Sequence, residues 1–166
     1  MDQRRRNIDA VHAFYRALQA QDMNSANALL TDDVELYILG RTPLSGRWVG
    51  KHEGMAELAK RVFALIEPAT WDFGRNYKIV CADDAGVVAF FLGGGRSIHG
   101  KAYDQTYLEL FRFRGDRISR IYEMVDTVMI EDALLDNPLA RPERNPPLPL
   151  DMSLIDGEGP PARTSS

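Results

Sequence analysis

Residues 100–129 constrain the fold of this chain more than any other segment. Apolar and polar side chains alternate on both sides of an Arg-Gly-Asp-Arg sequence at residues 114–117, which is typical of a tight turn. The pattern predicts a long antiparallel hairpin. Its second strand places the carboxylates of Glu123 and Asp126 among apolar neighbours. Because an unpaired charge in an apolar setting is costly, this hairpin is the first place to look for chemistry.

The composition narrows the class of protein. The chain has 166 residues, of which 45% are hydrophobic and 27% charged, and its formal net charge is −4. These values predict one soluble globular domain and argue against nucleic-acid binding. Arg4, Arg5 and Arg6 are not followed by an apolar run, so a secretory signal is not expected and the predicted location is the cytoplasm. No segment is apolar for long enough to suggest a membrane span.

The periodicity along the chain predicts three helices followed by a sheet. Helical spacing of apolar residues predicts helices over residues 7–21, 23–30 and 53–66. Period-two alternation predicts strands over residues 33–39, 71–81, 86–92, 98–113 and 118–128. Residues 93–95, three glycines, are expected to form a hairpin or a bulge. This order predicts an α+β fold, in which the three helices of the N-terminal half pack over an apolar pocket inside a cone-shaped, curved sheet.

The composition changes after Asn137. Seven prolines follow between Pro138 and Pro161, and proline cannot belong to a helix interior or a central strand. We therefore expect one domain over residues 1–136 and an extended, Pro-rich tail over residues 137–166. The tail carries enough apolar residues for part of it to lie along the domain or along a partner subunit.

Three segments resemble a known family. The first consists of residues 14–22, Phe-Tyr-Arg-Ala-Leu-Gln-Ala-Gln-Asp, with residues 28–34, Ala-Leu-Leu-Thr-Asp-Asp-Val. The second is residues 40–50, Gly-Arg-Thr-Pro-Leu-Ser-Gly-Arg-Trp-Val-Gly. The third is the hairpin, with Tyr-Asp-Gln-Thr-Tyr at 103–107 and Gly-Asp-Arg-Ile-Ser-Arg-Ile-Tyr-Glu-Met-Val-Asp-Thr at 115–127. These segments and their order resemble the SnoaL-like branch of the nuclear-transport-factor-2-like superfamily. The resemblance covers roughly residues 7–135 and leaves out the Pro-rich tail.

The resemblance implies proton chemistry without a metal or an organic cofactor. Enzymes of this superfamily isomerise, hydrate, dehydrate or cyclise small molecules in a deep apolar pocket, and other members only bind. Steroid isomerases of the fold carry a base and an acid at positions that match Leu36 and Phe14 here, so both groups are missing. In members that resemble limonene epoxide hydrolase, the polar positions match Leu36, Ile38, Phe90 and Leu92. Only their last-strand aspartate survives, as Glu123.

Strand pairing gives an independent prediction of the pocket wall. With a two-residue turn at Gly115-Asp116, Leu108 pairs with Glu123. Alternation then places Asp104, Thr106 and Leu108 on the same face as Glu123 and Val125. The opposite face carries the aromatic residues of the first strand together with Glu109, and it suits a sheet-to-sheet contact in a homodimer. A bulge would exchange the two faces and favour Asp126, whose simpler role is to cap the helical turn that follows.

The candidate site follows from these arguments. Glu123 is the expected general acid or base, because burial among apolar residues raises the pKa of a carboxyl group; a structural ion pair with an arginine is the equally weighted alternative. Asp104 or His99 is expected to assist it. The residues expected to contact a small, hydrophobic, aromatic or cyclic substrate are Leu36, Tyr37, Ile38, Trp48, Phe90, Thr106, Leu108 and Val125.

The expected function is that of a cofactor-independent lyase or isomerase that catalyses elimination, isomerisation or hydration. Two alternatives stay open: a non-catalytic ligand-binding or dimerisation module of the same fold, and an epoxide hydrolase. His12, His52 and His99 lack the spacing of metal ligands, so no metal is predicted. The single cysteine, Cys81, is expected to be a buried structural thiol.

Overall fold

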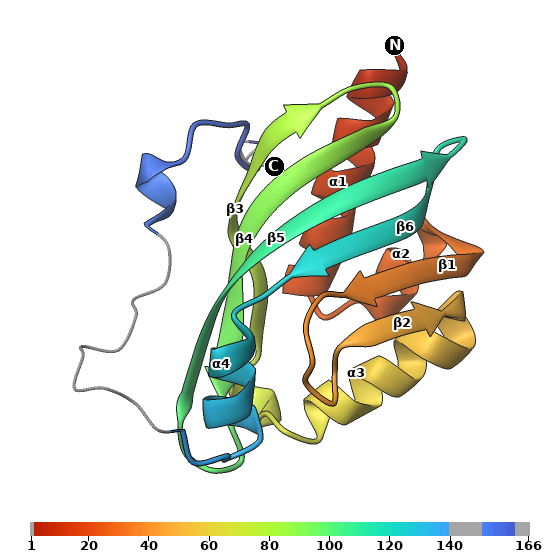
Figure 1. Cartoon of the computed structure of the whole chain (residues 1–166). Coiled ribbons are helices and arrows are strands. Elements are labelled where there is room, and N and C mark those ends of the chain that lie inside the picture. The colour runs from red at the N-terminus through yellow and green to blue at the C-terminus, as the bar shows by residue number, and fades with distance from the viewer. Residues whose placement is uncertain (1, 140–150, 162–166) are drawn as a thin grey trace.

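The computed structural model describes residues 2–139 and 151–161 (Figure 1). In chain order, its elements are α1 (Gln3–Gln19), α2 (Met23–Ala28), β1 (Leu30–Ile38), β2 (Gly46–Val49), the π-helical turn η1 (Gly50–Gly54), α3 (Met55–Phe63), the 3₁₀ turn η2 (Pro68–Thr70), β3 (Asp72–Ala82), β4 (Gly86–Arg96), β5 (Ala102–Arg114), β6 (Arg117–Met124), α4 (Thr127–Met129), the π-helical turn η3 (Ile130–Leu134) and the 3₁₀ turn η4 (Met152–Leu154). The three predicted helices and five predicted strands are present, and β2 is a strand that the sequence pattern did not predict.

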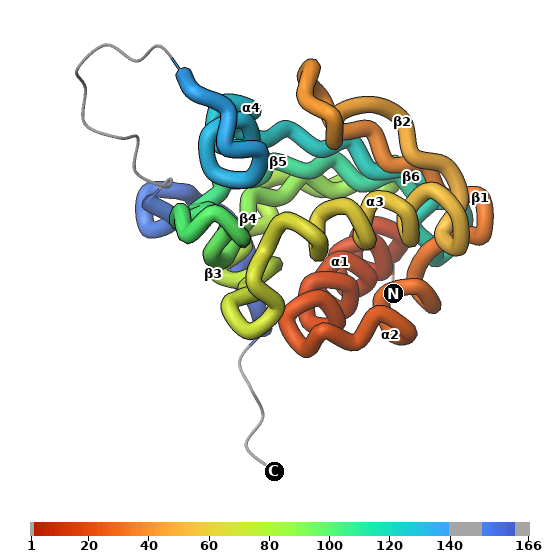
Figure 2. The backbone as a smooth tube through the Cα atoms, turned by 90° about the horizontal axis from the view of Figure 1, so that it is seen from below, coloured from red at the N-terminus to blue at the C-terminus, as the bar shows by residue number. Residues whose placement is uncertain are grey.

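The strands form one curved six-stranded sheet in the order β2-β1-β6-β5-β4-β3. β1 and β6 are parallel, and every other neighbouring pair is antiparallel. Helices α1, α2 and α3 lie together on one side of the sheet, as Figure 2 shows. The predicted α+β cone is therefore confirmed, with its interior between the helices and the concave face of the sheet.

Helix α1 anchors the core. The side chain of Asp2 caps its first turn by accepting a hydrogen bond of 2.7 Å from Arg5 N. Its buried face includes Tyr15, which is fully buried and contacts Tyr77, Phe91 and Phe111 at ring-centroid distances of 4.6, 5.2 and 5.8 Å. One helix is thereby fixed against three neighbouring strands.

The β5–β6 hairpin has the predicted turn but not the predicted register. Arg114 pairs with Arg117, as expected for a turn at residues 115–116, but the register shifts between Arg112 and Phe113. One extra residue on β6 makes Glu109, and not Leu108, the partner of Glu123. The predicted face of β6 is therefore right, whereas the predicted face of β5 is wrong.

Between the pairs Asp72–Gly94 and Arg75–Leu92 the register of β3 and β4 shifts, so a bulge but no hairpin lies at the glycines of residues 93–95. They belong to β4, which pairs with β5 without a register shift from Gly86 to Arg96. A Cβ atom on Gly94 would lie 1.7 Å from the carbonyl oxygen of Tyr103. Glycine is thus required for the close approach of the two backbones. The expected bulge occurs in the pairing of β4 with β3 and not in its pairing with β5.

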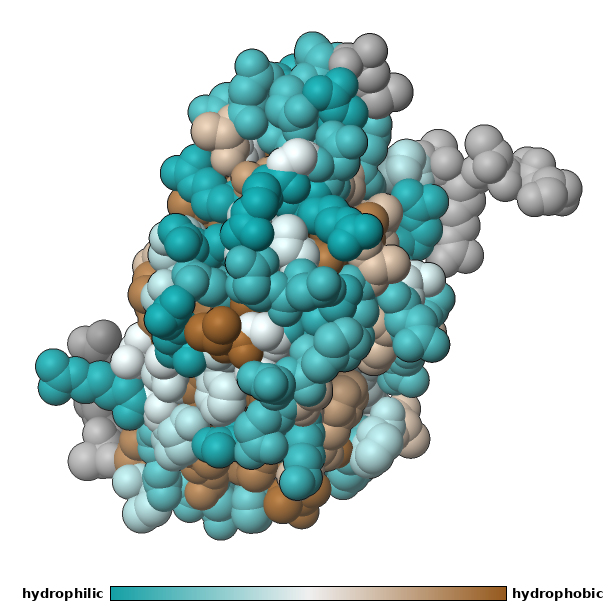
Figure 3. Space-filling model, turned by 90° about the vertical axis from the view of Figure 1, so that its right-hand side faces the viewer, coloured by the Kyte–Doolittle hydropathy of each residue, from teal (hydrophilic) through white to brown (hydrophobic). Residues whose placement is uncertain are grey.

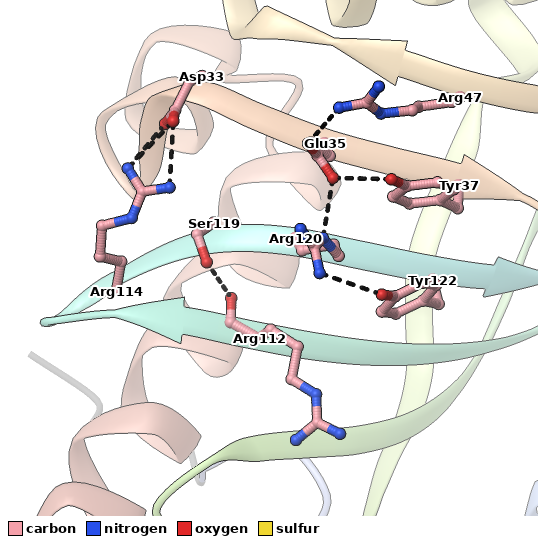
Figure 4. Close-up of polar contacts among 9 residues, drawn as sticks. All are labelled: Asp33, Glu35, Tyr37, Arg47, Arg112, Arg114, Ser119, Arg120 and Tyr122. Carbon is pink, nitrogen blue, oxygen red and sulfur yellow. Dashed lines mark hydrogen bonds and ion pairs between the residues drawn. The ribbon is translucent and has the colours of Figure 1, made fainter.

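The outer face of the sheet carries a network of charged and aromatic side chains (Figure 4). Glu35 accepts hydrogen bonds from Arg47, from Arg120 at 2.9 Å and from the Tyr37 hydroxyl at 2.8 Å. The hydrogen bond from Arg47, followed by those from Tyr37 and Arg120, lowers the pKa of Glu35 to about 2. The Tyr37 and Tyr122 rings stack 5.1 Å apart. The side chains of this network thus hold one another in place on the side of the sheet that faces away from the interior.

The described part of the tail lies along α1 and β3. Ile79 and Glu158 exchange two backbone hydrogen bonds of 2.8 Å, and Met152 is buried. The Glu158 carboxylate also lies 3.0 Å from Nε2 of the buried His12, whose Nδ1 is 2.6 Å from the Tyr77 hydroxyl. Residues 140–150 and 162–166 of the predicted extended tail lie outside the described residues.

The surface of the protein is mainly polar on the side shown in Figure 3. Its apolar side chains form small separate patches on this side. Within residues 2–139 and 151–161, no helix is both long and apolar enough to cross a bilayer. Cys81 is exposed on β3, so the prediction of a buried thiol is wrong.

Candidate functional site

A cavity of about 640 Å³ lies between the helices and the concave face of the sheet. This volume is in the range of small-molecule sites. Its walls are mainly apolar, and the residues that form them include Phe14, Leu18, Leu36, Ile38, Met55, Leu58, Val62, Phe63, Trp71, Phe73, Phe91, Ile121 and Val125.

Two carboxyl groups line the cavity from neighbouring strands. Glu109 on β5 and Glu123 on β6 are direct cross-strand partners, which places their side chains on the same face of the sheet. The two carboxyl groups share a hydrogen bond. Glu109 is buried, with 4% of its surface exposed, whereas Glu123 is half-buried. Glu123 is thus the more accessible member of a carboxyl pair.

Burial raises the pKa of both groups. Loss of hydration is the main cause, and it raises the pKa of Glu109 to about 7 even though hydrogen bonds from Tyr15 and Glu123 favour its ionised form. The pKa of Glu123 is raised well above its usual value by burial and then by the charge of Glu109. Among the described residues, neither carboxylate forms an ion pair with a Lys, Arg or His side chain. The pair therefore holds a proton near neutral pH.

One tyrosine hydroxyl contacts the carboxyl pair, and two further tyrosines line the same cavity. Tyr15 donates a 2.6 Å hydrogen bond to Oε2 of Glu109. Tyr103 and Tyr107 line the cavity, and their hydroxyl oxygens lie 3.1 Å apart. Burial raises the pKa of Tyr103 to about 12 and that of Tyr107 well above its usual value. Both therefore remain protonated. One of the two O–H groups donates to the other hydroxyl, and the second can donate a hydrogen bond to an oxygen that becomes negative.

Four of the predicted site residues lie in this cavity: Glu123, Leu36, Ile38 and Val125. The other seven, which the structure does not place among the residues lining the cavity, are Asp104, His99, Tyr37, Trp48, Phe90, Thr106 and Leu108.

The register shift explains the displaced residues of β5. Asp104, Thr106 and Leu108 alternate with the buried residues Tyr103 and Tyr107 and therefore lie on the outer face of the sheet. Asp104 is exposed and lies 3.8 Å from Arg75, so the predicted pocket position of this carboxylate is wrong. A one-residue slip moves every side chain of a strand to the opposite face.

The remaining displaced residues lie on other elements. Phe90 pairs with Leu108 on the outer side of the sheet, and Tyr37 faces outward in the Glu35 network. Trp48 donates its indole N–H to the carbonyl of Leu44 at 3.1 Å, and it packs on the core without lining the cavity. His99 is exposed in the turn between β4 and β5.

Four site residues escaped the sequence-based prediction: Glu109, Tyr15, Tyr103 and Tyr107. The sequence does contain a signal for the three that lie on β5. One face of this strand is strongly aromatic, with Tyr103, Tyr107 and Phe111, and an aromatic face is typically buried. That face also contains Glu109. Asp126 does cap α4, since its carboxylate accepts hydrogen bonds from the backbone N–H groups of Val128 and Met129.

The described residues contain no group of three or more His, Cys, Asp or Glu side chains arranged to hold a metal ion. The polar groups that reach the cavity are carboxyls, hydroxyls, amides and two lysines. They are suited to proton transfer and hydrogen bonding.

Replacing Tyr15 with phenylalanine tests the link between this hydroxyl and the pair. The hydrogen bond from Tyr15 lowers the pKa of Glu109, so its loss is expected to move the titration of the pair to higher pH. ¹³C NMR of protein labelled at glutamate Cδ measures this directly. Tyr122→Phe, which removes a hydroxyl on the outer face, is the control, and an unchanged titration in Tyr15→Phe would show that the hydroxyl has no such influence.

Comparisons with known proteins identify the family and support the fold. The family model of the SnoaL-like domain matches residues 11–121. A search of curated protein sequences found no match. Solved structures do match, including a protein from Bacillus subtilis assigned provisionally as an isomerase (19% identity, TM-score 0.66), which covers 85% of this chain and 100% of its own.

Two further matches have similar values. A phenazine biosynthesis-related protein, PhzB2 from Pseudomonas aeruginosa, has 19% identity and a TM-score of 0.66, and the match covers 86% of this chain and 92% of that one. TerC, whose structure was determined with polyporic acid, has 19% identity and a TM-score of 0.61, and the match covers 78% and 98% of the two chains. At these identities the structural matches support the fold.

Proposed function

Because the chain belongs to the SnoaL-like domain family of the NTF2-like superfamily, we propose that it is a cofactor-independent acid–base enzyme of the isomerase or lyase type. Its substrate is a small, largely apolar molecule with an aromatic or cyclic body. The single observation that carries the proposal is the Glu109–Glu123 pair, which lies in an apolar cavity and has no cationic partner among the described residues.

The pair has the properties of a general acid–base. Two adjacent buried carboxyls ionise one at a time, so at neutral pH one of them accepts a proton while the other donates one. Glu123 is the member in contact with substrate, because it is the more exposed of the two. Glu109 accepts a hydrogen bond from Glu123, and its charge raises the proton affinity of Glu123.

In the proposed step, the proton of the pair moves along the shared hydrogen bond from Glu123 to the ionised Glu109, and the carboxylate of Glu123 then removes a proton from a carbon next to a substrate carbonyl. The electron pair of the broken C–H bond forms an enolate, whose oxygen accepts hydrogen bonds from Tyr103 or Tyr107. Return of the proton to a different carbon gives isomerisation. Loss of a leaving group from the neighbouring carbon, protonated as it departs, gives elimination.

The relatives support the substrate class. One is a phenazine biosynthesis-related protein and another was crystallised with polyporic acid, and both names concern cyclic compounds. The aromatic side chains of the cavity here, Trp71, Phe73 and Phe91, offer flat apolar surfaces to a ring of this kind.

Proton exchange tests the proposal whatever the net reaction is. A panel of aromatic and cyclic ketones, enones, epoxides and diols is incubated with the protein in D₂O, and ¹H NMR monitors both C–H exchange and product formation. The expected result is exchange or turnover of at least one compound by the wild type and a large loss in Glu123→Gln. Binding without exchange across the panel would indicate a binding module, and full activity of the variant would refute the assigned role.

We also propose that the outer face of the sheet forms a homodimer. The sequence pattern assigned this contact to the aromatic face of β5, which is wrong, because Tyr103 and Tyr107 are buried and line the cavity. Apolar and aromatic residues are contiguous on the outer face, since Phe90 pairs with Leu108, and Leu108 with Met124, which is 52% exposed. Sedimentation velocity is expected to give a dimer for the wild type and a monomer for Leu108→Arg. A monomeric wild type would contradict the proposal.

A further inference from the structure

We infer that the substrate carries an anionic group that binds at the mouth of the cavity, where Lys60 recognises it. This inference deepens the proposed function, on which it rests for the assumption that the cavity is the substrate site. It specifies an amphiphilic acid with an apolar ring in the middle, a carbonyl or hydroxyl group near the carboxyl pair, and a carboxylate or sulfonate at the mouth.

The exposed lining residues locate the mouth. Five residues that line the cavity are also exposed at the surface: Gln21, Met23, Lys60, Phe63 and Pro68. They belong to the α1–α2 turn, to α2, and to α3 and the segment that follows it, whose positions can be followed in Figure 2. The cavity therefore opens on the helical side, opposite the wall formed by the sheet.

Charges are separated along the cavity. The lining contains two acidic residues, Glu109 and Glu123, on the sheet side, and two basic residues, Lys51 and Lys60, on the helical side. A substrate group near the sheet meets carboxyls that hold a proton, whereas a group near the helices meets positive charge. An anion is favoured at the mouth and disfavoured beside the acids.

Lys60 is the available cation. Lys51 is committed to Asp32, with Nζ 2.6 Å from Oδ1 and a side chain only 13% exposed. Within the described part of the chain, Lys60 forms no ion pair or side-chain hydrogen bond, although its neighbour Arg61 binds Glu57 and lies over Trp48. A free ammonium group at the rim of an apolar cavity is suited to the charged end of an amphiphile.

Two dyes that share one aromatic skeleton test the inference without the natural substrate. 8-Anilinonaphthalene-1-sulfonate carries a sulfonate, and N-phenyl-1-naphthylamine is the same skeleton without it. Both become fluorescent in an apolar cavity. Displacement of the neutral dye by the anionic dye shows whether the two occupy the same site.

Lys60→Gln is expected to weaken binding of the anionic dye by about three- to fivefold, the range given by one partly exposed ion pair. Binding of the neutral dye is expected to stay unchanged. Lys60→Arg keeps the charge and should bind the anionic dye like the wild type, and added salt should weaken only the anionic dye. Arg61→Gln is the matched control, because it removes the same charge from the next residue of α3, which does not line the cavity.

Loss of affinity for the anionic dye in Lys60→Gln alone supports the inference. An equal effect in Lys60→Gln and Arg61→Gln, or no effect in either, overturns it but leaves the acid–base proposal intact. If neither dye binds the wild type, the cavity does not admit a ring of this size, and the proposed function is contradicted together with the inference.

Discussion

Replacement of Glu123 with glutamine is expected to lower kcat by about 10²- to 10⁴-fold, the usual contribution of a general acid–base. Glutamine has nearly the same shape but can neither accept nor release a proton at this position. KM should change much less, because the walls that hold the apolar body remain. The measurement is steady-state kinetics on the compound that the exchange screen identifies.

The partner variant separates two roles within the pair. Glu109→Gln removes the charge that raises the pKa of Glu123, so the basic form of Glu123 should appear at lower pH and the pH–rate profile should shift to acid. Glu57→Gln on the exposed surface of α3 is the control for the substitution itself. Equal activity of Glu123→Gln and Glu57→Gln would exclude Glu123 as the proton carrier.

The titration of Glu109 alone is expected to make the folded protein less stable at pH 8 than at pH 5 by about 3 kcal/mol, and the raised pKa of Glu123 acts in the same direction. The pKa of Glu109 is about 7 in the folded state, compared with about 4.3 for an unperturbed glutamate. The folded state therefore binds a proton that the unfolded state releases. This stabilisation is complete below the unfolded pKa and is lost as the pH rises through the folded pKa.

Urea denaturation at several pH values measures this slope. Glu109→Gln should flatten it between pH 5 and 7, and the double variant with Glu123→Gln should flatten it further. Glu35, whose pKa is lowered to about 2, contributes only at more acidic pH, so its loss should not alter the slope in this window. A slope that is unchanged in both variants would show that the carboxyl pair does not hold a proton in the folded state.

Local patterns were sufficient for most of the fold. The spacing of Ile8, Val11 and Phe14 predicts α1, because a helix must turn one apolar stripe toward the core. Alternation in β6 correctly assigned Ile121 and Glu123 to the inner face. These features depend on neighbours in sequence, which is why the sequence reveals them.

The candidate site depended on one residue of register. The extra residue of β6 between the pairs Phe113–Ile118 and Arg112–Arg120 reverses the face of β5 relative to β6. No composition signal marks this position, since a bulge is decided by how two strands fit together. It brought Glu109 into the cavity and sent Asp104 to the outer surface.

The sequence by itself determined the order of helices and strands, the family resemblance and the inward position of Glu123. Only the tertiary structure decided that Glu123 faces a second carboxyl group and not an arginine, and that Lys60 stands at the mouth of the same cavity. The physical reason is that a proton affinity depends on burial and on the nearest charges. Those charges come from α3, β5 and β6, which the folded chain brings together from distant parts of the sequence.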